Sequence, residues 1–478
     1  MGELESSNSS PLLIKISDPD EGGLRQRALT ESKLLWRIIG PAIISRLSSY
    51  SWNCITQAFT GHIGEIELAA FSILSSVVCG FDLGFLIGMS SAMDTLCGQA
   101  YGGKQYEMLG VYLQRSCLVL LATALLLLPL YLFTAPLLKL LGQPPEVADL
   151  AGQMALCTIP MHFSFAFIFP LHKFLQCQYK NSVYAWAGAA GLFVHLAVTW
   201  LVVSVMGLGA VAASAVQSVT WWFWAAVMAV YILAGGCPLT WQGFSVHAFS
   251  GLWEFVKLSA ASGVMICLEN WYYRILVLMI GNMDNAAIAI GALSVCMSIN
   301  GWENSIPLSF CGGTSVRVAN ELGAGKGKKA RFATIVSVVT STGIGVLIMT
   351  IILVFHKPIA LLFTSSKLVL DEVNSMSLLL ALTILFNSVQ PVLSGVAVGS
   401  GWQGRVAYIN IACYYIVGLP LGILMQWVFH MGIMGVWGGM IFGGTALQTV
   451  ILCILTIRCD WDKEAEKATK YVKKWSEV

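Results

Sequence analysis

Charged residues are scarce in this chain of 478 residues. They form 11% of the sequence, whereas hydrophobic residues form 57%, and soluble proteins carry roughly 25% charged residues. Because so few charges cannot cover a water-exposed surface of this size, the composition excludes an ordinary water-soluble protein. A formal net charge of +2 gives no reason to expect a nucleic-acid partner. We therefore predict an all-α protein that crosses a lipid bilayer several times.

Motifs that carry chemistry are also missing. The 13 cysteines include no CxxC pair and no Cys/His cluster, which argues against a metal site or a disulfide framework. The glycine-rich segments 101–104 and 323–329 do not match GxxxxGK[ST], so no nucleotide site is expected. No nucleophile or cofactor motif is evident either. We expect a protein that is not an enzyme and that binds no metal, cofactor, nucleotide or nucleic acid.

Long apolar segments are what the sequence does contain. A membrane-spanning helix needs about 20 mainly apolar residues, and twelve segments meet that requirement. They lie at 34–59, 66–96, 108–133, 147–175, 182–205, 209–234, 251–279, 287–315, 331–355, 372–400, 405–428 and 433–457. Pro41 in the first segment and Pro391 in the tenth are the expected kinks.

The lysines and arginines are unevenly distributed between the loops. With the N-terminus in the cytosol, most of them fall on the cytosolic side, and only Lys139, Lys357 and Lys367 fall on the other. Such a bias sets the orientation of membrane proteins. We therefore expect both termini in the cytosol, with an N-terminal tail at 1–33 and a C-terminal tail at 458–478.

The two halves of the chain repeat each other. Residues 95–104 follow the second segment as residues 317–326 follow the eighth, and Pro170 corresponds to Pro391 at almost the same offset. Two copies of an even number of spans have the same orientation, so an axis along the membrane normal should relate them. We predict an N-lobe at 34–235, a cytosolic linker at 236–250 and a C-lobe at 251–457. The binding cavity is expected between the lobes.

Several collinear motifs together resemble the plant branch of the multidrug and toxic compound extrusion (MATE) family. The motifs are 95–102, 267–269, 316–325, 394–403 and 435–440. The resemblance implies two six-helix lobes in a V shape and proton-driven export of organic compounds across the vacuolar membrane, more than the plasma membrane. We also expect a monomer. Many plant members carry a second acid in the tenth helix, where this chain has Asn387. This difference argues against a proton relay of two carboxylates in the C-lobe and favours Glu269 acting with neutral polar partners.

Glu269 is the candidate proton site. It lies in the middle of the seventh apolar segment, and an ionisable residue at bilayer depth is a functional hypothesis by default. The corresponding part of the first segment has Ser49 and no acid, so the scaffold does not require a carboxylate there. An ion pair with Arg274 is the structural alternative. Five residues apart, however, these two side chains do not share a helix face.

Further residues are candidates for lining the cavity, each with a structural alternative. Tyr272 and Tyr273 follow Glu269 by three and four residues, and packing is their alternative role. One helix face carries Asn387, Gln390 and Ser394. The alternative role of these three residues is hydrogen bonding between helices. The other candidates are Glu303, Asp82, Arg46 and His195. Arg46 is expected to pair with Asp82 or to attract an anionic solute, and His195 is either a proton group or a core residue.

The C-terminal tail alternates apolar and basic residues at helical spacing. Trp461, Ala465, Ala468, Val472 and Trp475 recur every three or four residues between lysines. This pattern is typical of an amphipathic helix on the cytosolic leaflet, and a frayed charged tail is the alternative.

The combined prediction is a proton-coupled antiporter that exports organic solutes, such as xenobiotics, flavonoids or alkaloids, by alternating access. Small solutes, protons and the lipid bilayer are its expected partners. The alternative is a transporter or channel for chloride or organic anions on the same fold.

Overall fold

The computed structural model describes residues 23–280, 286–361 and 367–476. In these ranges all regular structure is helical, as a bilayer demands, because a helix satisfies its own backbone hydrogen bonds. The α-helices are α1 (Leu24–Ile63), α2 (Glu65–Ile73), α3 (Gly80–Ser90), α4 (Ala92–Gly102), α5 (Met108–Leu132), α6 (Thr134–Leu140), α7 (Pro145–Cys177), α8 (Asn181–Trp200), α9 (Gly209–Tyr231), α10 (Leu252–Ile280), α11 (Ala286–Gly323), α12 (Gly327–Leu361), α13 (Lys367–Ser400), α14 (Gln403–Asn410), α15 (Leu419–Trp427), α16 (Gly432–Met440), α17 (Leu447–Ile457) and α18 (Trp461–Ser476).

Short irregular helices join or interrupt these elements. Five are π-helical: η1 (Leu74–Cys79), η2 (Leu201–Val205), η3 (Ile232–Gly236), η5 (Ile411–Gly418) and η6 (Ile441–Ala446). The remaining short helix, η4 (Val246–Phe249), is a 3₁₀ helix in the predicted linker. Pro41 and Pro391, the expected kink positions, both lie inside continuous α-helices.

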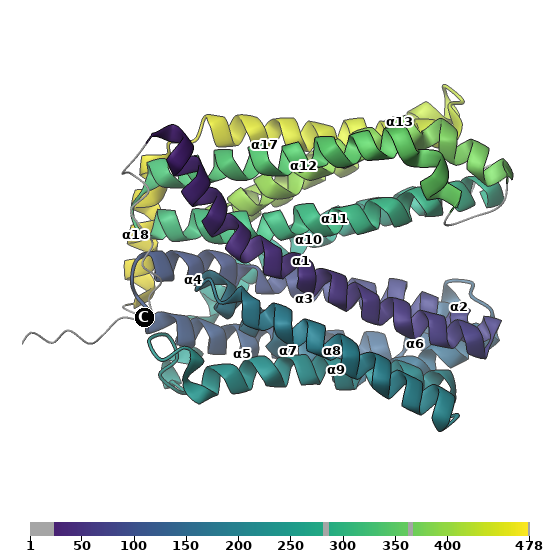
Figure 1. The fold of residues 1–478 in the computed structure, drawn as a ribbon, viewed down its shortest axis with the longest axis horizontal. Helices are drawn as coiled ribbons and strands as arrows, with labels where there is room; N and C mark the ends of the chain where they lie inside the picture. The colour runs from purple at the N-terminus through teal and green to yellow at the C-terminus, as the bar shows by residue number, and fades with distance from the viewer. Residues whose placement is uncertain (1–22, 281–285, 362–366, 477–478) are drawn as a thin grey trace, which may run out of the picture.

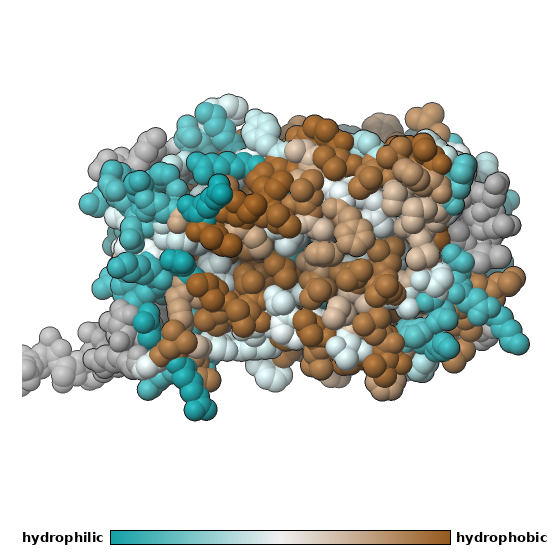
Figure 2. Space-filling model, turned by 90° about the horizontal axis from the view of Figure 1, so that it is seen from above, coloured by the Kyte–Doolittle hydropathy of each residue, from teal (hydrophilic) through white to brown (hydrophobic). Residues whose placement is uncertain are grey.

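Nine stretches of the described residues are long and apolar enough to span a membrane. They correspond to nine of the twelve predicted segments. The other three predicted segments fall in α1, α10 and α11, so the count of twelve remains a prediction. On the face shown in Figure 2, an apolar band lies between two hydrophilic ends, as expected for a protein embedded in a bilayer.

The helices form two groups that lie side by side (Figure 1). The first group contains α2 to α9 and the second contains α11 to α17, while α1 crosses from the second group to the first. Each group has its own apolar core: Trp52, Phe165 and Trp224 belong to one core, and Tyr414 and Trp437 to another. We use the names N-lobe and C-lobe for these groups, and the exact lobe boundaries remain predictions.

The lobes approach each other most closely at the end that carries α18, which we call the closed end. A Cβ added to Gly102 would lie 1.9 Å from the carbonyl oxygen of Asn320, and one added to Gly323 would lie 2.0 Å from that of Gln99. These glycines belong to the two repeated segments found in the sequence. Only residues without a side chain let the two backbones come so near.

A buried polar network around Arg317 also joins the lobes at the closed end. Arg317 on α11 donates to both carboxylate oxygens of Glu31 on α1, at 2.7 and 2.8 Å, and to Glu321 at 2.7 Å. The hydroxyl of Tyr179, between α7 and α8, accepts a further hydrogen bond from Arg317. Helix α1 begins at Leu24, so the described part of the predicted tail at 1–33 is helical, and Glu31 in it belongs to this network.

The C-terminal helix α18 crosses the closed end (Figure 1). The expected helix forms, but its expected place on the leaflet is wrong. Its apolar face packs against protein, because α18 contacts α11 and α12 of the C-lobe and α4 of the N-lobe. Its buried residues are Trp461, Ala465, Ala468 and Val472. This burial leaves Lys467 and Lys470 on the outer face, where they pair with Glu464 and Glu466 of the same helix.

Candidate solute and proton sites between the lobes

Glu269 lies on α10 and faces α13. It is half-buried, and the side chain of Gln390 is its hydrogen-bonding neighbour. Gln390 in turn donates to the hydroxyl of Ser394 at 3.1 Å. The structure thus brings together three of the predicted site residues on two helices. Within the described residues, Glu269 has no ion-pair partner, so a neutral amide is the group that faces its carboxyl.

A second polar pair lies near these residues, between α11 and α13. Asn387 donates to the side-chain oxygen of Asn300 at 3.0 Å. It therefore forms an interhelical hydrogen bond, which is the alternative role predicted for it. Glu303 lies one turn beyond Asn300 and is 7% exposed. Neither of its carboxylate oxygens has a hydrogen-bond partner among the described residues. A charge buried without a partner is unfavourable, so this environment favours the neutral acid.

The two tyrosines after Glu269 do not join this group. Tyr272 is completely buried, donates to the carbonyl of Met440 at 2.6 Å and stacks on Tyr414 with 4.5 Å between ring centroids. Its expected place in the cavity is wrong, because its ring fills the space between α10, α16 and η5. The side chain of Tyr273 lies outside the described residues, as does that of Arg274.

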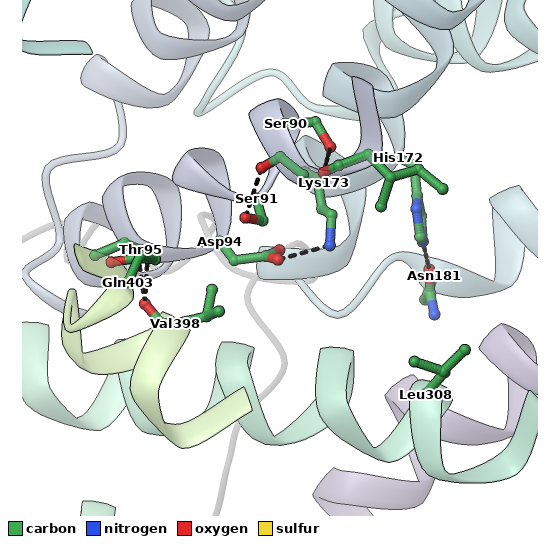
Figure 3. A network of polar contacts seen from close by, with 12 residues as sticks. Ser90, Ser91, Asp94, Thr95, His172, Lys173, Asn181, Leu308, Val398 and Gln403 are labelled. Atoms are coloured by element: carbon green, nitrogen blue, oxygen red, sulfur yellow. Dashed lines mark hydrogen bonds and ion pairs between the residues drawn. The ribbon is translucent and has the colours of Figure 1, made fainter. Parts of the chain in front are cut away.

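Four charged groups lie within electrostatic reach of Cys311 on α11, and we call them the central charge cluster. They are Arg46, Asp94, Lys173 and Glu269. Lys173 on α7 and Asp94 on α4 form an ion pair at 2.6 Å (Figure 3). The carboxylate of Asp94 is therefore held by a lysine from another helix.

Arg46 has a different environment from Lys173. Its guanidinium lies 3.5 Å from the carbonyl oxygen of Leu308, and it forms no ion pair among the described residues. It borders a cavity of about 380 Å³ whose lining comes from α1 and the N-lobe helices, apart from Ser305 on α11. We call this space the N-lobe cavity, and among the described residues of its lining Arg46 is the one that carries a charge. The polar and aromatic residues of that lining include Ser49, Tyr50, Asn53, Gln217 and Trp221. A cation, hydroxyl and amide groups and flat rings therefore face one space.

The expected pairing of Arg46 with Asp82 does not form. Asp82 is completely buried, and its Oδ2 atom lies 2.8 Å from both Nδ1 of His162 and the hydroxyl of Tyr131. His195, the histidine singled out in the sequence, is a core residue. Its ring nitrogens lie 2.9 Å from the hydroxyl of Thr56 and 2.8 Å from that of Thr220, so small neutral partners satisfy it.

Sequence reasoning missed Lys173 and His162. Lys173 lies near the end of a predicted segment, so it was counted with the loops. His162 lies as deep in its segment as His195 does. A comparison of the depths of the histidines with that of Asp82 would have made His162 a candidate. Its contact with Asp82 could not be predicted, because the two residues are 80 positions apart in the sequence.

The comparisons with known proteins identify the family. The family profile described as MatE matches residues 41–201 and 261–424. The chain belongs to the MATE family. Protein DETOXIFICATION 27 of Arabidopsis thaliana is 59% identical over 475 residues, covering 99% of this chain and 98% of the relative. Protein DETOXIFICATION 26 of the same plant is 56% identical over 466 residues, covering 97% and 95%.

A solved structure agrees with this assignment. The crystal structure of the eukaryotic MATE transporter AtDTX14 matches with a TM-score of 0.88 at 35% identity, covering 93% of this chain and 99% of that one. The MATE resemblance and the all-α membrane fold predicted from the sequence are therefore confirmed. As a MATE family member, this chain is an integral, multi-pass membrane transporter of the detoxification type, and the family is one of transporters and not of enzymes.

Proposed function

We propose that this MATE family member is a proton-coupled antiporter that exports organic solutes from the cytosol, with Glu269 as its proton site. The observation that carries this proposal is the environment of Glu269. The carboxyl is half-buried, a neutral amide of Gln390 faces it, and no cation holds it in its charged form within the described residues. A group in such a place can exist with or without its proton.

The closed end supports a particular place for this structure in the transport cycle. If both termini are cytosolic, the glycine contacts and the Glu31–Arg317 pair close the cytosolic side. Glu269 would then take up a proton from the acidic lumen or exterior while solute leaves. Opening the closed end would return the proton to the cytosol and admit the next solute. The cycle needs a proton gradient and no cofactor, and one chain holds all the residues it uses.

The gradient limits what this exchange can achieve. A difference of two pH units supplies about 2.7 kcal/mol per proton. One-to-one exchange of a neutral solute then permits roughly 100-fold accumulation, since about 1.4 kcal/mol corresponds to a factor of ten. A vacuolar membrane, with its acidic lumen, fits this direction of transport.

The test uses purified protein in lipid vesicles with an imposed pH gradient. Flavonoid glucosides, plant alkaloids, citrate and cationic dyes are screened, and the solute that the unmodified protein accumulates most is retained. We expect Glu269→Gln to abolish that accumulation, because the amide cannot carry a proton, while the variant elutes as a folded protein. Accumulation at the unmodified level in the variant would exclude Glu269 as the proton site.

An anion pathway is the second candidate, and Arg46 is the observation that favours it. A guanidinium beside a cavity, without a carboxylate partner among the described residues, attracts negative charge. Chloride currents that persist without a pH gradient would favour this candidate over the antiporter.

A further inference from the structure

Three N-lobe helices carry a π-helical segment or a proline close to where they meet. The π-helix η1 ends at Cys79, directly before α3, and π-bulges occur frequently at functional sites. Pro129 lies inside α5 and Pro160 inside α7. Each irregularity lies within three residues of one member of a buried trio, which consists of Asp82, Tyr131 and His162.

The irregularity in α7 is built with a side chain from another helix. The hydroxyl of Ser218 on α9 accepts from the backbone nitrogen of Met161 at 3.2 Å and donates to the carbonyl of Cys157 at 3.1 Å. It is thus inserted into the hydrogen-bond ladder of α7 directly before His162. An inserted hydroxyl next to a proline is a recognised cause of a helix kink. This part of α7 is therefore predisposed to bend.

The hydrogen bonds of His162 set the number of protons in the trio. Its Nε2 atom lies 2.8 Å from the carbonyl oxygen of Ala124 on α5. A carbonyl only accepts hydrogen bonds, so Nε2 carries a hydrogen. Nδ1 then contacts Asp82 in one of two ways: it donates to a carboxylate as part of an imidazolium, or it accepts from a protonated carboxyl. In both cases the pair holds one more proton than a carboxylate beside a neutral imidazole does.

Loss of that proton would place two hydrogen-bond acceptors, Nδ1 and Oδ2, 2.8 Å apart. It would also leave a net negative charge where both side chains are completely buried. Such a state requires the contact to open. The occupancy of this proton is therefore linked to the relative positions of α3 and α7, and α7 is the helix with the inserted hydroxyl.

Few other titratable groups surround the pair. Tyr131 from α5 donates to the same oxygen, and the thiol of Cys79 from η1 faces Asp82 and Tyr131. On the other side of α3, α10 presents Asn270 to Gly84 and the ring of Trp271 to Phe81. Glu269 on α10 is directed at Gln390. The other carboxylate oxygen of Asp82, Oδ1, is buried without a hydrogen-bond partner among the described residues.

The N-lobe cavity lies next to the pair. Cys79, Gly80 and Leu83 line it from the side of Asp82, and Met161 lines it from the side of His162. The helices that carry the pair therefore border a space that can hold water or solute. A small bend of α7 would connect the pair with that space.

We propose that Asp82 and His162 form a second proton-binding site, in the N-lobe, which exchanges its proton with the cavity as α7 bends. This inference rests on the proposed proton-coupled cycle, in which it gives each lobe one proton site. The proton leaves from the Nδ1–Oδ2 contact and passes to water in the cavity. Binding of the proton restores the contact, and no other bond is made or broken.

The test is an infrared titration of the full-length protein in lipid, compared between acidic and alkaline pH. In the unmodified protein we expect changes in carboxyl and imidazole bands. Asp82→Asn keeps the hydrogen bonds of the protonated pair, since its amide accepts from Tyr131 and donates to Nδ1, but it cannot titrate. We expect the imidazole change of the pair and its carboxyl change to be lost in this variant. Both should remain in Asp149→Asn, the matched control, which makes the same change at an exposed aspartate of α7 that pairs with Lys139.

Identical titration spectra for Asp82→Asn and the unmodified protein would overturn the proposal and leave the pair as a purely structural contact. Should Asp82→Asn fail to fold, ¹⁵N labelling of the histidines in the unmodified protein decides the question, because an exchanging pair must change the ring signal of one buried histidine with pH. The Asp82-dependent signal should persist in Glu269→Gln. A failure of Glu269 as the coupling residue is therefore distinguishable from a failure of this second site.

Discussion

Arg317 at the closed end and Arg46 at the centre are both arginines inside the helical bundle, and their surroundings differ. Arg317 donates to Glu31, Glu321 and Tyr179, whereas Arg46 has one long contact, with a backbone carbonyl. The same contrast extends to the acids: Glu31 is held by two hydrogen bonds, and Glu303 by none among the described residues. Arg317 and Glu31 are thus paired at the closed end, whereas Arg46 and Glu303 have no ion-pair partner among the described residues.

The stability of the protein should depend most strongly on the ion pair at the closed end. Glu31→Gln leaves Arg317 buried with a single carboxylate partner, and breaking a buried ion pair costs about 3–5 kcal/mol. We expect a large fall in the midpoint of thermal unfolding in detergent. Lys467→Ala, which removes an exposed partner of Glu464 on α18, is the matched control and should change stability by about 0–1 kcal/mol. Equal effects of the two variants would contradict the contrast.

Substitution of the glycines at the closed end should have the second largest effect. A methyl group at Gly102 or Gly323 meets backbone atoms of the other lobe, and overpacking of this kind costs about 1–3 kcal/mol. We expect each alanine variant to reduce the population closed at this end by about tenfold, and transport with it. Accessibility of Cys97 and Cys177 to a thiol reagent would report the opening.

A glycine with free space around it provides the control for this prediction. A Cβ at Gly404 on α14 would meet no atom within 4 Å, so Gly404→Ala should transport as the unmodified protein does. Normal transport by both Gly102→Ala and Gly323→Ala would show that the closed end is not part of the cycle.

Arg46→Gln should have the smallest effect on stability, because it removes a charge that has no ion-pair partner among the described residues. We expect no loss of stability, because the change removes a half-buried charge and breaks no ion pair. Transport of an anionic solute such as citrate should nevertheless fall, while that of a neutral flavonoid glucoside should not. A loss of stability as large as that of Glu31→Gln would mean that Arg46 is a structural residue.

Much of the fold was predictable from the sequence, because length and apolar composition decide which segments span a bilayer. Glu269, Gln390 and Ser394 were predictable together, since helical spacing places the last two on one face and depth makes the acid conspicuous. Tyr272 and Asp82 were not, because helical spacing does not show which neighbouring helix a face meets. The position of α18 was predicted wrongly for the same reason: an amphipathic face can bind lipid or protein, and only the tertiary structure distinguishes them.

The most direct test of the central claim compares two transport modes of Glu269→Gln in the same vesicles. Exchange of labelled solute at equal pH requires solute binding and lobe movement, whereas accumulation driven by a pH gradient also requires the proton. If Glu269 is the proton site, the variant should exchange solute but accumulate none. Accumulation by the variant at the level of the unmodified protein would contradict the claim, and loss of both modes would contradict a role confined to the proton.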